Sequence, residues 1–99
     1  MSMKTIKVRE LFKQGNLATR ENGLILRKEI EEALKTFDSV FVDFDGINLV
    51  TQSFIDEVFG VLVREKGLSF IRNHIKIKGA SDFVKSMIKF VISYSQKAA

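Results

Sequence analysis

The chain has 99 residues, of which 45% are hydrophobic and 28% charged, and its length predicts one domain, residues 1–99, with a core over about 4–95. It has no cysteine and one histidine, which excludes disulfides and thiolate chemistry, so we expect neither a structural metal nor a cofactor. The net charge of +4 is unevenly distributed along the chain. Residues 64–99 carry eight Lys/Arg and two acidic residues, whereas residues 1–63 carry eight Lys/Arg and ten acidic residues.

Alternating residues near the start of the chain predict a short strand over about 4–9, with Ile6 and Val8 on one face. An amphipathic helix follows and ends near Phe37, because apolar residues recur at helical spacing from Leu26 onward. The start of this helix has two interpretations. Thr19 is a suitable N-cap, whereas Asn22-Gly23 is also a hairpin signal, and we favour the helix.

The segment SVFVDF, residues 39–44, has apolar side chains on both faces, which predicts a central strand covered on both sides. A second helix is expected from about Ser53 to Gly67, since Ser53 and Asp56 have the spacing of a capping box.

The segment HIKIKG predicts a further strand with Ile75 and Ile77 pointing inward. Ser81-Asp82 then caps a last helix with a regular apolar stripe, and residues 95–99 should fray. Strands and helices therefore alternate, which favours an α/β fold: a small mixed sheet of three to four strands with helices packed on it.

Two aspartates at the end of the central strand raise the question of phosphoryl transfer. Asp43-Phe44-Asp45-Gly46 matches the opening of haloacid-dehalogenase-type phosphatases, in which the aspartates serve as nucleophile and acid/base around magnesium. After Glu57, only Glu65 and Asp82 remain as further acids, and a receiver-like site would need an acidic pair where the chain has Arg9-Glu10. We therefore predict that the protein is not an enzyme.

The same residues have a structural interpretation. Asp45-Gly46 can form the turn that leaves the strand, assisted by Asn48, and Ser53 can be a helix N-cap. Asp56 and Glu57 would then lie in the first turn of the helix, where negative charge is favoured by roughly 0.3–1 kcal/mol.

The pattern of residues 42–53 nevertheless resembles a known family. Val42 to Ile47, followed by Thr51-Gln52-Ser53, resembles the strand-turn-helix core of STAS domains. Phe44 to Ile47 with the run Ser53 to Glu57, preceded by residues 16–20, is similar to the small prokaryotic STAS-like family of unknown function. Thr51 and Phe54 depart from the Asp-Ser-Ser-Gly hallmark of STAS domains.

The resemblance implies a non-enzymatic regulatory module related to anti-sigma-factor antagonists. In those proteins a serine at the place of Ser53 is phosphorylated by a partner kinase and controls docking. We therefore expect a protein partner, such as a kinase-like ATPase or a transcription regulator, with possible phosphorylation of Ser53. The predicted partner-binding residues lie at the carboxyl ends of the strands and at the helix start: Asp45, Asn48, Thr51, Gln52, Ser53, Asp56 and Glu57.

The basic last third supports an alternative function, which is nucleic-acid binding. Aromatic platforms for bases are scarce in the sequence, and lysines on an edge strand are also an ordinary defence against sheet pairing. The candidate contacts are Arg72, His74, Lys76, Lys78, Lys85 and Lys89.

The apolar segments are all short. The first ten residues lack an apolar stretch of signal-peptide length, and charges interrupt every later apolar segment. We therefore predict a soluble cytoplasmic protein without a membrane partner.

Overall fold

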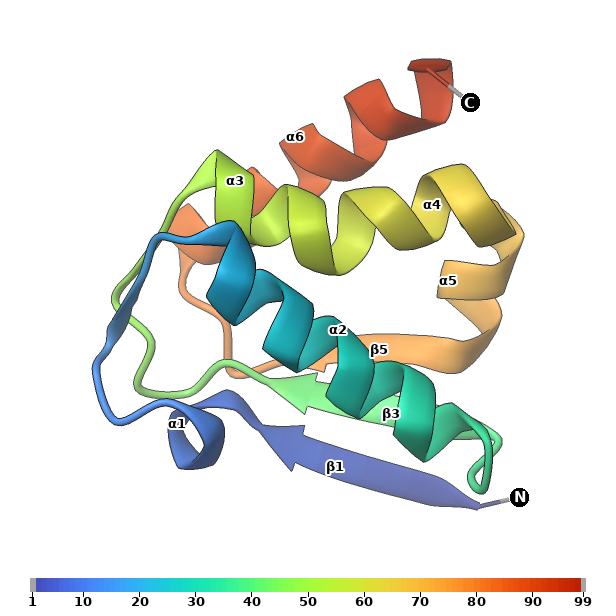
Figure 1. Ribbon diagram of the computed structural model, residues 1–99, viewed down its shortest axis with the longest axis horizontal. Helices are drawn as coiled ribbons and strands as arrows, with labels where there is room; N and C mark the ends of the chain where they lie inside the picture. The colour runs from blue at the N-terminus through green and yellow to red at the C-terminus, as the bar shows by residue number, and fades with distance from the viewer. Residues whose placement is uncertain (1, 99) are drawn as a thin grey trace.

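The computed structural model describes residues 2–98 and confirms the predicted α/β class (Figure 1). Short elements that the sequence did not reveal lie between the predicted ones. In chain order the elements are β1 (Met3–Lys7), α1 (Val8–Leu11), β2 (Asn16–Leu17), α2 (Arg20–Leu34), β3 (Ser39–Asp43), β4 (Leu49–Val50), α3 (Gln52–Ile55), η1 (Asp56–Gly60), α4 (Val61–Lys66), α5 (Leu68–His74), β5 (Ile75–Lys78) and α6 (Asp82–Ala98).

The main sheet has three strands in the order β1-β3-β5, so the predicted central place of residues 39–43 is confirmed. Thr5 pairs with Phe41, which in turn pairs with Lys76, and both pairings are parallel. The sheet is therefore parallel where we predicted a mixed one. The reason is that a crossover containing helices joins each strand of this sheet to the next.

A second, two-stranded sheet pairs β2 with β4, again in parallel. It lies beyond the carboxyl ends of β1 and β3, where the loops after these strands run side by side (Figure 1). Its pairing is extended by hydrogen bonds from the backbone N–H of Asn48 to the carbonyl of Gly15 (2.8 Å) and from Thr51 to Leu17 (3.1 Å).

Within residues 2–98, helices cover one face of the main sheet and leave the other face open (Figure 1). The strands form the lower layer in Figure 1, and α2, α4 and α6 lie above them. The inner face contributes buried residues such as Val40, Val42 and Ile75 to the core, whereas Phe41 on the other face lies outside the core and is half-buried. The prediction that β3 is covered on both sides was therefore wrong, since the exposed Thr5 and Lys76 are its neighbours there.

The first long helix begins as the capping interpretation predicted. The side-chain oxygen of Thr19 accepts a hydrogen bond from the backbone N–H of Asn22 (3.1 Å), so the hairpin alternative was wrong. The helix ends at Leu34, three residues before Phe37, and a turn follows it.

The elements α3, η1 and α4 follow one another without a break and form one rod, residues 52–66, that ends at Gly67 with φ 89°. Its N-cap is Thr51, whose side-chain oxygen accepts from the backbone N–H of Phe54 (3.2 Å). The Ser53 N-cap was therefore wrong, because Ser53 is already helical. Asp56 and Glu57 consequently lie two residues deeper in the rod than we predicted, in its second turn and not its first.

The last helix also differs from its prediction at one end. Ser81 caps it as predicted, accepting from the backbone N–H of Val84 (3.2 Å). The expected fraying of residues 95–99 was wrong for residues 95–98, because the helix continues to Ala98 and Ser95 is fully buried, and residue 99 lies outside the described residues. Among residues 2–98, none of the helices has the length and apolar character needed to cross a bilayer.

Candidate functional site

The turn after β3 holds the exposed members of the predicted site. Asp45 and Asn48 are exposed, and the backbone N–H of Ile47 donates to the carbonyl of Phe44 (3.0 Å), which closes the predicted turn. Asp43 supports this turn, since its carboxylate accepts from the backbone N–H of Asp45 (2.9 Å). Gly46 has φ 82°, a conformation that favours glycine. Asp43 thus has a structural role in the turn, whereas the side chain of Asp45 is exposed.

Thr51 holds the backbone that carries the exposed side chains of Leu49 and Gln52. Besides capping the rod, its hydroxyl donates to the carbonyl of Ala18 (2.7 Å), and so it joins the β4 loop to the β2 loop. On this fixed backbone Leu49 is 47% exposed and Gln52 is exposed. The sequence analysis missed Leu49, although its alternation with the buried Val50 was a signal.

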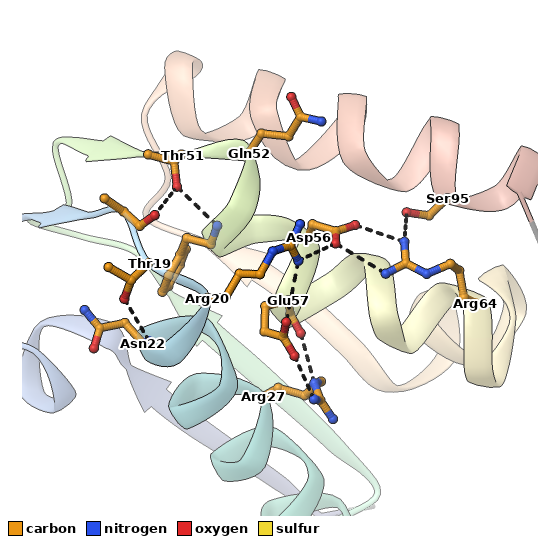
Figure 2. A network of polar contacts seen from close by, with 12 residues as sticks. Thr19, Arg20, Asn22, Arg27, Thr51, Gln52, Asp56, Glu57, Arg64 and Ser95 are labelled. Carbon is orange, nitrogen blue, oxygen red and sulfur yellow. Dashed lines mark hydrogen bonds and ion pairs between the residues drawn. The ribbon is translucent and has the colours of Figure 1, made fainter.

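Asp56, in contrast, is buried at the centre of an ion-pair network (Figure 2). Arg20 from α2 approaches one carboxylate oxygen at 2.7 Å, and Arg64 from α4 approaches the other at 2.9 Å. Arg64 also donates to the hydroxyl of the buried Ser95 (3.0 Å), and Tyr94 donates to Asp56 (3.3 Å). One carboxylate therefore binds side chains from α2, α4 and α6.

The charged form of Asp56 is the stable one. Burial alone would raise the pKa of this carboxyl group, but hydrogen bonds from Arg64 and Arg20 outweigh burial and lower the pKa below its usual value. The same pairing raises the pKa of both arginines. Asp56 therefore stays ionised throughout the physiological pH range.

Gly60 leaves room for this carboxylate. A Cβ atom at position 60 would collide with Oδ1 of Asp56 and would lie 2.9 Å from the hydroxyl of Ser95. The backbone between the two residues is a π-helical turn, in which the N–H of Val61 bonds to the carbonyl of Asp56. A glycine one turn after Asp56, followed by Arg64 one turn further, is the sequence signal for this arrangement.

Glu57 is held by a second arginine. Nη2 of Arg27 lies 3.0 Å from the Glu57 carboxylate, and Nε of Arg27 donates to the Glu57 carbonyl (2.9 Å). Nη1 of Arg20 lies 3.5 Å from the same carboxylate, so Arg20 lies between Asp56 and Glu57. Of the three acids that we predicted to bind a partner, Asp56 and Glu57 are therefore paired within the domain. The exposed part of the predicted site is formed by Asp45, Asn48 and Gln52.

Ser53 lies in the first turn of the rod and is half-buried. Residues three and four positions apart share a helix face, which places Ser53 on the side of Asp56 and Glu57. The sequence alone suggests that these carboxylates would repel a phosphate on Ser53. In the structure each carboxylate has an arginine partner, which reduces that repulsion.

The six basic residues of the alternative site do not form one surface. Lys76 and Lys78 project from the uncovered face of the sheet. Lys85 and Lys89 line a hollow of about 160 Å³ beside Ile77, which points to the inner face. Arg72 is exposed, and its carbonyl accepts from Lys76 (2.7 Å), whereas His74 is half-buried with Nδ1 2.8 Å from the carbonyl of Asp38.

Within residues 2–98, His, Asp and Glu side chains form no group of three or more that could hold a metal ion. A groove of about 540 Å³ lies between α2, α4 and α5, and both lysines and glutamates line it. None of the predicted partner-binding residues lines this groove or the hollow beside Ile77.

Comparison with known proteins agrees with this fold. A family model described as a STAS-like domain of unknown function (DUF4325) matches residues 22–85, which is more than half of the chain and includes most of α2, β3, the turn and the whole rod. No curated protein and no solved structure matches the chain significantly. On the strength of the family match, the chain belongs to the STAS-like domains of unknown function.

Proposed function

We propose that this STAS-like domain is a regulatory module without chemistry of its own, and that it binds a protein partner through a turn surface formed by Asp45, Asn48, Leu49 and Gln52. One observation carries the proposal: an exposed leucine stands among exposed polar side chains on a backbone held by hydrogen bonds. Exposed apolar groups within a polar rim are typical of protein interfaces.

The position in the fold supports the same function. The turn surface lies beyond the carboxyl ends of parallel strands, where open α/β sheets usually bind their ligands. It continues onto α6, because the side-chain amide of Gln52 donates to the hydroxyl of Tyr94 (3.2 Å). The ring of Tyr94 contacts the ring of Phe90 edge to face, with the ring centres 5.3 Å apart. Phe90 is 56% exposed. Leu49 and Phe90 are therefore the apolar anchors that we expect at the centre of the contact.

Phosphorylation of Ser53 would give this surface a switch. A phosphate at the start of the rod would be attracted by the free backbone N–H groups there and by Arg20, whose side chain is 55% exposed. Arg20 would then be shared between the phosphate and Asp56, which would loosen the contact of α2 with the rod. A kinase-like ATPase or a transcription regulator is the class of partner that we propose.

The test of the turn surface compares matched surface variants. Purified wild-type protein captures partners from lysate of the source organism, the partner is identified by mass spectrometry, and its affinity is then measured with pure components. We expect Leu49→Asp and Asp45→Lys each to weaken binding at least tenfold. The matched controls Ile25→Asp, at a side chain 48% exposed, and Glu29→Lys change the same chemistry on α2 and should bind normally. Equal affinity of all four variants would refute the proposal.

The switch is tested separately. Phosphopeptide mapping of protein purified from the source organism should reveal modified Ser53, and Ser53→Asp should weaken partner binding while Ser53→Ala binds as the wild type does. Ser69→Asp, at an exposed position on α5, is the matched control. Unmodified Ser53 together with normal binding by Ser53→Asp would remove the switch and leave the turn surface in place.

A further inference from the structure

The uncovered face of the main sheet carries a regular array of side chains. In a parallel sheet, paired residues lie side by side on one face, so the register defines rows across the three strands. The row nearest the carboxyl ends contains Lys7, Asp43 and Lys78, and the middle row contains Thr5, Phe41 and Lys76. Phe41 is thus the aromatic centre of this face. All of these side chains except Phe41 and Asp43 are exposed, and those two are half-buried.

Phe41 has an unusual environment for a phenylalanine of this chain. It stands on the central strand, outside the core, and its neighbours across the sheet are a threonine and a lysine. Nζ of Lys78 lies 5.2 Å from the centre of its ring, where a cation meets the negative face of the aromatic system. The ring therefore already binds a cation through a face that no helix covers.

The charges around the ring favour an anionic ligand. Among the described residues, Lys7, Lys76 and Lys78 form no ion pair with a carboxylate. Asp43 is the one acid in these rows, and its carboxylate accepts the backbone hydrogen bond of Asp45. The face thus combines one aromatic ring with three ammonium groups that no carboxylate neutralises, of which that of Lys76 donates to the carbonyl of Arg72 (2.7 Å).

From this juxtaposition we propose that the open sheet face binds single-stranded nucleic acid, with Phe41 stacking against a base and Lys7, Lys76 and Lys78 contacting phosphates. Bases of a single strand are free to stack on an aromatic side chain, and a basic surface beside the ring follows the backbone. Lys76 and Lys78 stand two residues apart on β5, about 6.6 Å along the strand, and can contact successive phosphates. In the complex Lys78 moves from the ring to a phosphate, so the base occupies the place of the ammonium group.

Duplex nucleic acid fits this face less well. The bases of a duplex are stacked on each other and offer no free face to Phe41, so only the phosphate contacts would remain. An acidic protein segment would likewise use the lysines and leave the ring without a specific role. The stacking contribution of Phe41 is therefore the property that identifies the ligand.

This inference does not depend on the proposed protein partner. The turn surface uses Leu49 and Gln52, whereas the sheet face uses Phe41 and lysines of β1 and β5. Each surface has its own variants, so one proposal can fail while the other stands.

The experiment measures fluorescence anisotropy of a labelled mixed-sequence 12-nucleotide single strand, as DNA and as RNA, over a salt series from 50 to 200 mM. We expect the logarithm of affinity to fall against the logarithm of salt with a slope of about −2, which corresponds to three phosphate contacts on a single strand. Phe41→Leu keeps an apolar side chain but removes the ring, and it should weaken binding by roughly fivefold to a hundredfold. The triple variant Lys7→Gln, Lys76→Gln, Lys78→Gln should abolish the salt dependence.

Matched controls change the same residue types elsewhere. Phe90→Leu alters an aromatic side chain on α6, and the triple variant Lys28→Gln, Lys35→Gln, Lys66→Gln removes three lysines from the helical side. Both controls should bind the single strand as the wild type does. Circular dichroism and thermal melting of every variant show whether the fold is intact.

Four results would overturn the proposal. They are no binding of either single strand at 50 mM salt, equal losses in the two lysine triples, no effect of Phe41→Leu in a folded variant, and equal or tighter binding of the matching duplex. If polyglutamate of the same charge competes fully while Phe41→Leu has no effect, the face is instead a docking surface for an acidic protein. Concentration-dependent dimers that Phe41→Leu abolishes, without oligonucleotide binding, would assign the face to a second copy of the chain.

Discussion

At the scale of single residues, Asp56 has the largest structural influence, because side chains from three helices converge on its buried carboxylate. Replacing it with asparagine keeps the size of the side chain but removes the charge that both arginines bind. We expect Asp56→Asn to lower the free energy of unfolding by about 2 kcal/mol at pH 7, since Arg20 and Arg64 are partly solvated and lose less than fully buried partners would. Urea denaturation measures this difference, and Asp45→Asn, at an exposed position, is the control.

The pH dependence of the same variant follows from the lowered pKa of Asp56. A carboxyl group whose folded pKa lies below its unfolded value, about 4, stabilises the protein fully above that value and loses this effect as pH falls through the folded pKa. The stability difference between wild type and Asp56→Asn should therefore be constant from pH 7 to about 5 and shrink below about 4. A difference that does not change down to pH 2 would contradict the assigned role of the charge.

At the scale of elements, two hydroxyl residues lie at the start of the rod, and the sequence alone does not show which of them is the N-cap. Thr51 both caps the rod and donates to Ala18, whereas Ser53 lies inside the first turn. We expect Thr51→Val to cost about 1 kcal/mol of stability or more and Thr51→Ser to restore most of it, while Ser53→Ala changes stability by less than about 0.5 kcal/mol. Thermal and urea unfolding of the three variants distinguish them. A larger loss of stability in Ser53→Ala than in Thr51→Val would show that Thr51 is not the N-cap of the rod.

The elements also show which features could be predicted from the sequence. Helices α2 and α6 have a hydroxyl cap followed by a regular apolar stripe, so local signals were sufficient. Strands β2 and β4 have two residues each and are too short to show periodicity. The uncovered face of β3 escaped prediction because apolar residues on both sides of a strand do not reveal whether helices cover both.

The candidate site was predicted in part for a similar reason. Exposed polar residues after a strand, such as Asp45 and Asn48, are local features of the chain. The pairing of Asp56 with Arg20 joins residues 36 positions apart, and no local pattern contains it. Asp56 and Glu57 are paired with arginines from other helices and so do not belong to the exposed surface, whereas Leu49 does.

At the scale of the whole molecule, the domain presents two surfaces of different character. The turn surface lies at the carboxyl ends of the strands and joins α6, whereas the open sheet face lies on the side away from the helices (Figure 1). A protein partner and a nucleic-acid strand should therefore bind at the same time.

Measuring each surface variant in the binding assay of the other surface tests whether the two surfaces bind independently. Leu49→Asp should bind the labelled oligonucleotide with wild-type affinity, and Phe41→Leu should retain the protein partner. Loss of both activities in either variant, with the fold intact, would show that the two surfaces act as one.

The parallel register has a further consequence for how the protein is made. Met3 pairs with Ser39 and Val40 pairs with Ile75, so β1 and β3 must each await a partner strand synthesised about 35 residues later. The buried residues Val84, Ile88 and Val91 come from α6 and leave the ribosome after all the strands. The nascent chain therefore has no complete core until α6 emerges, and we expect part of its apolar interior to be exposed to aggregation until then.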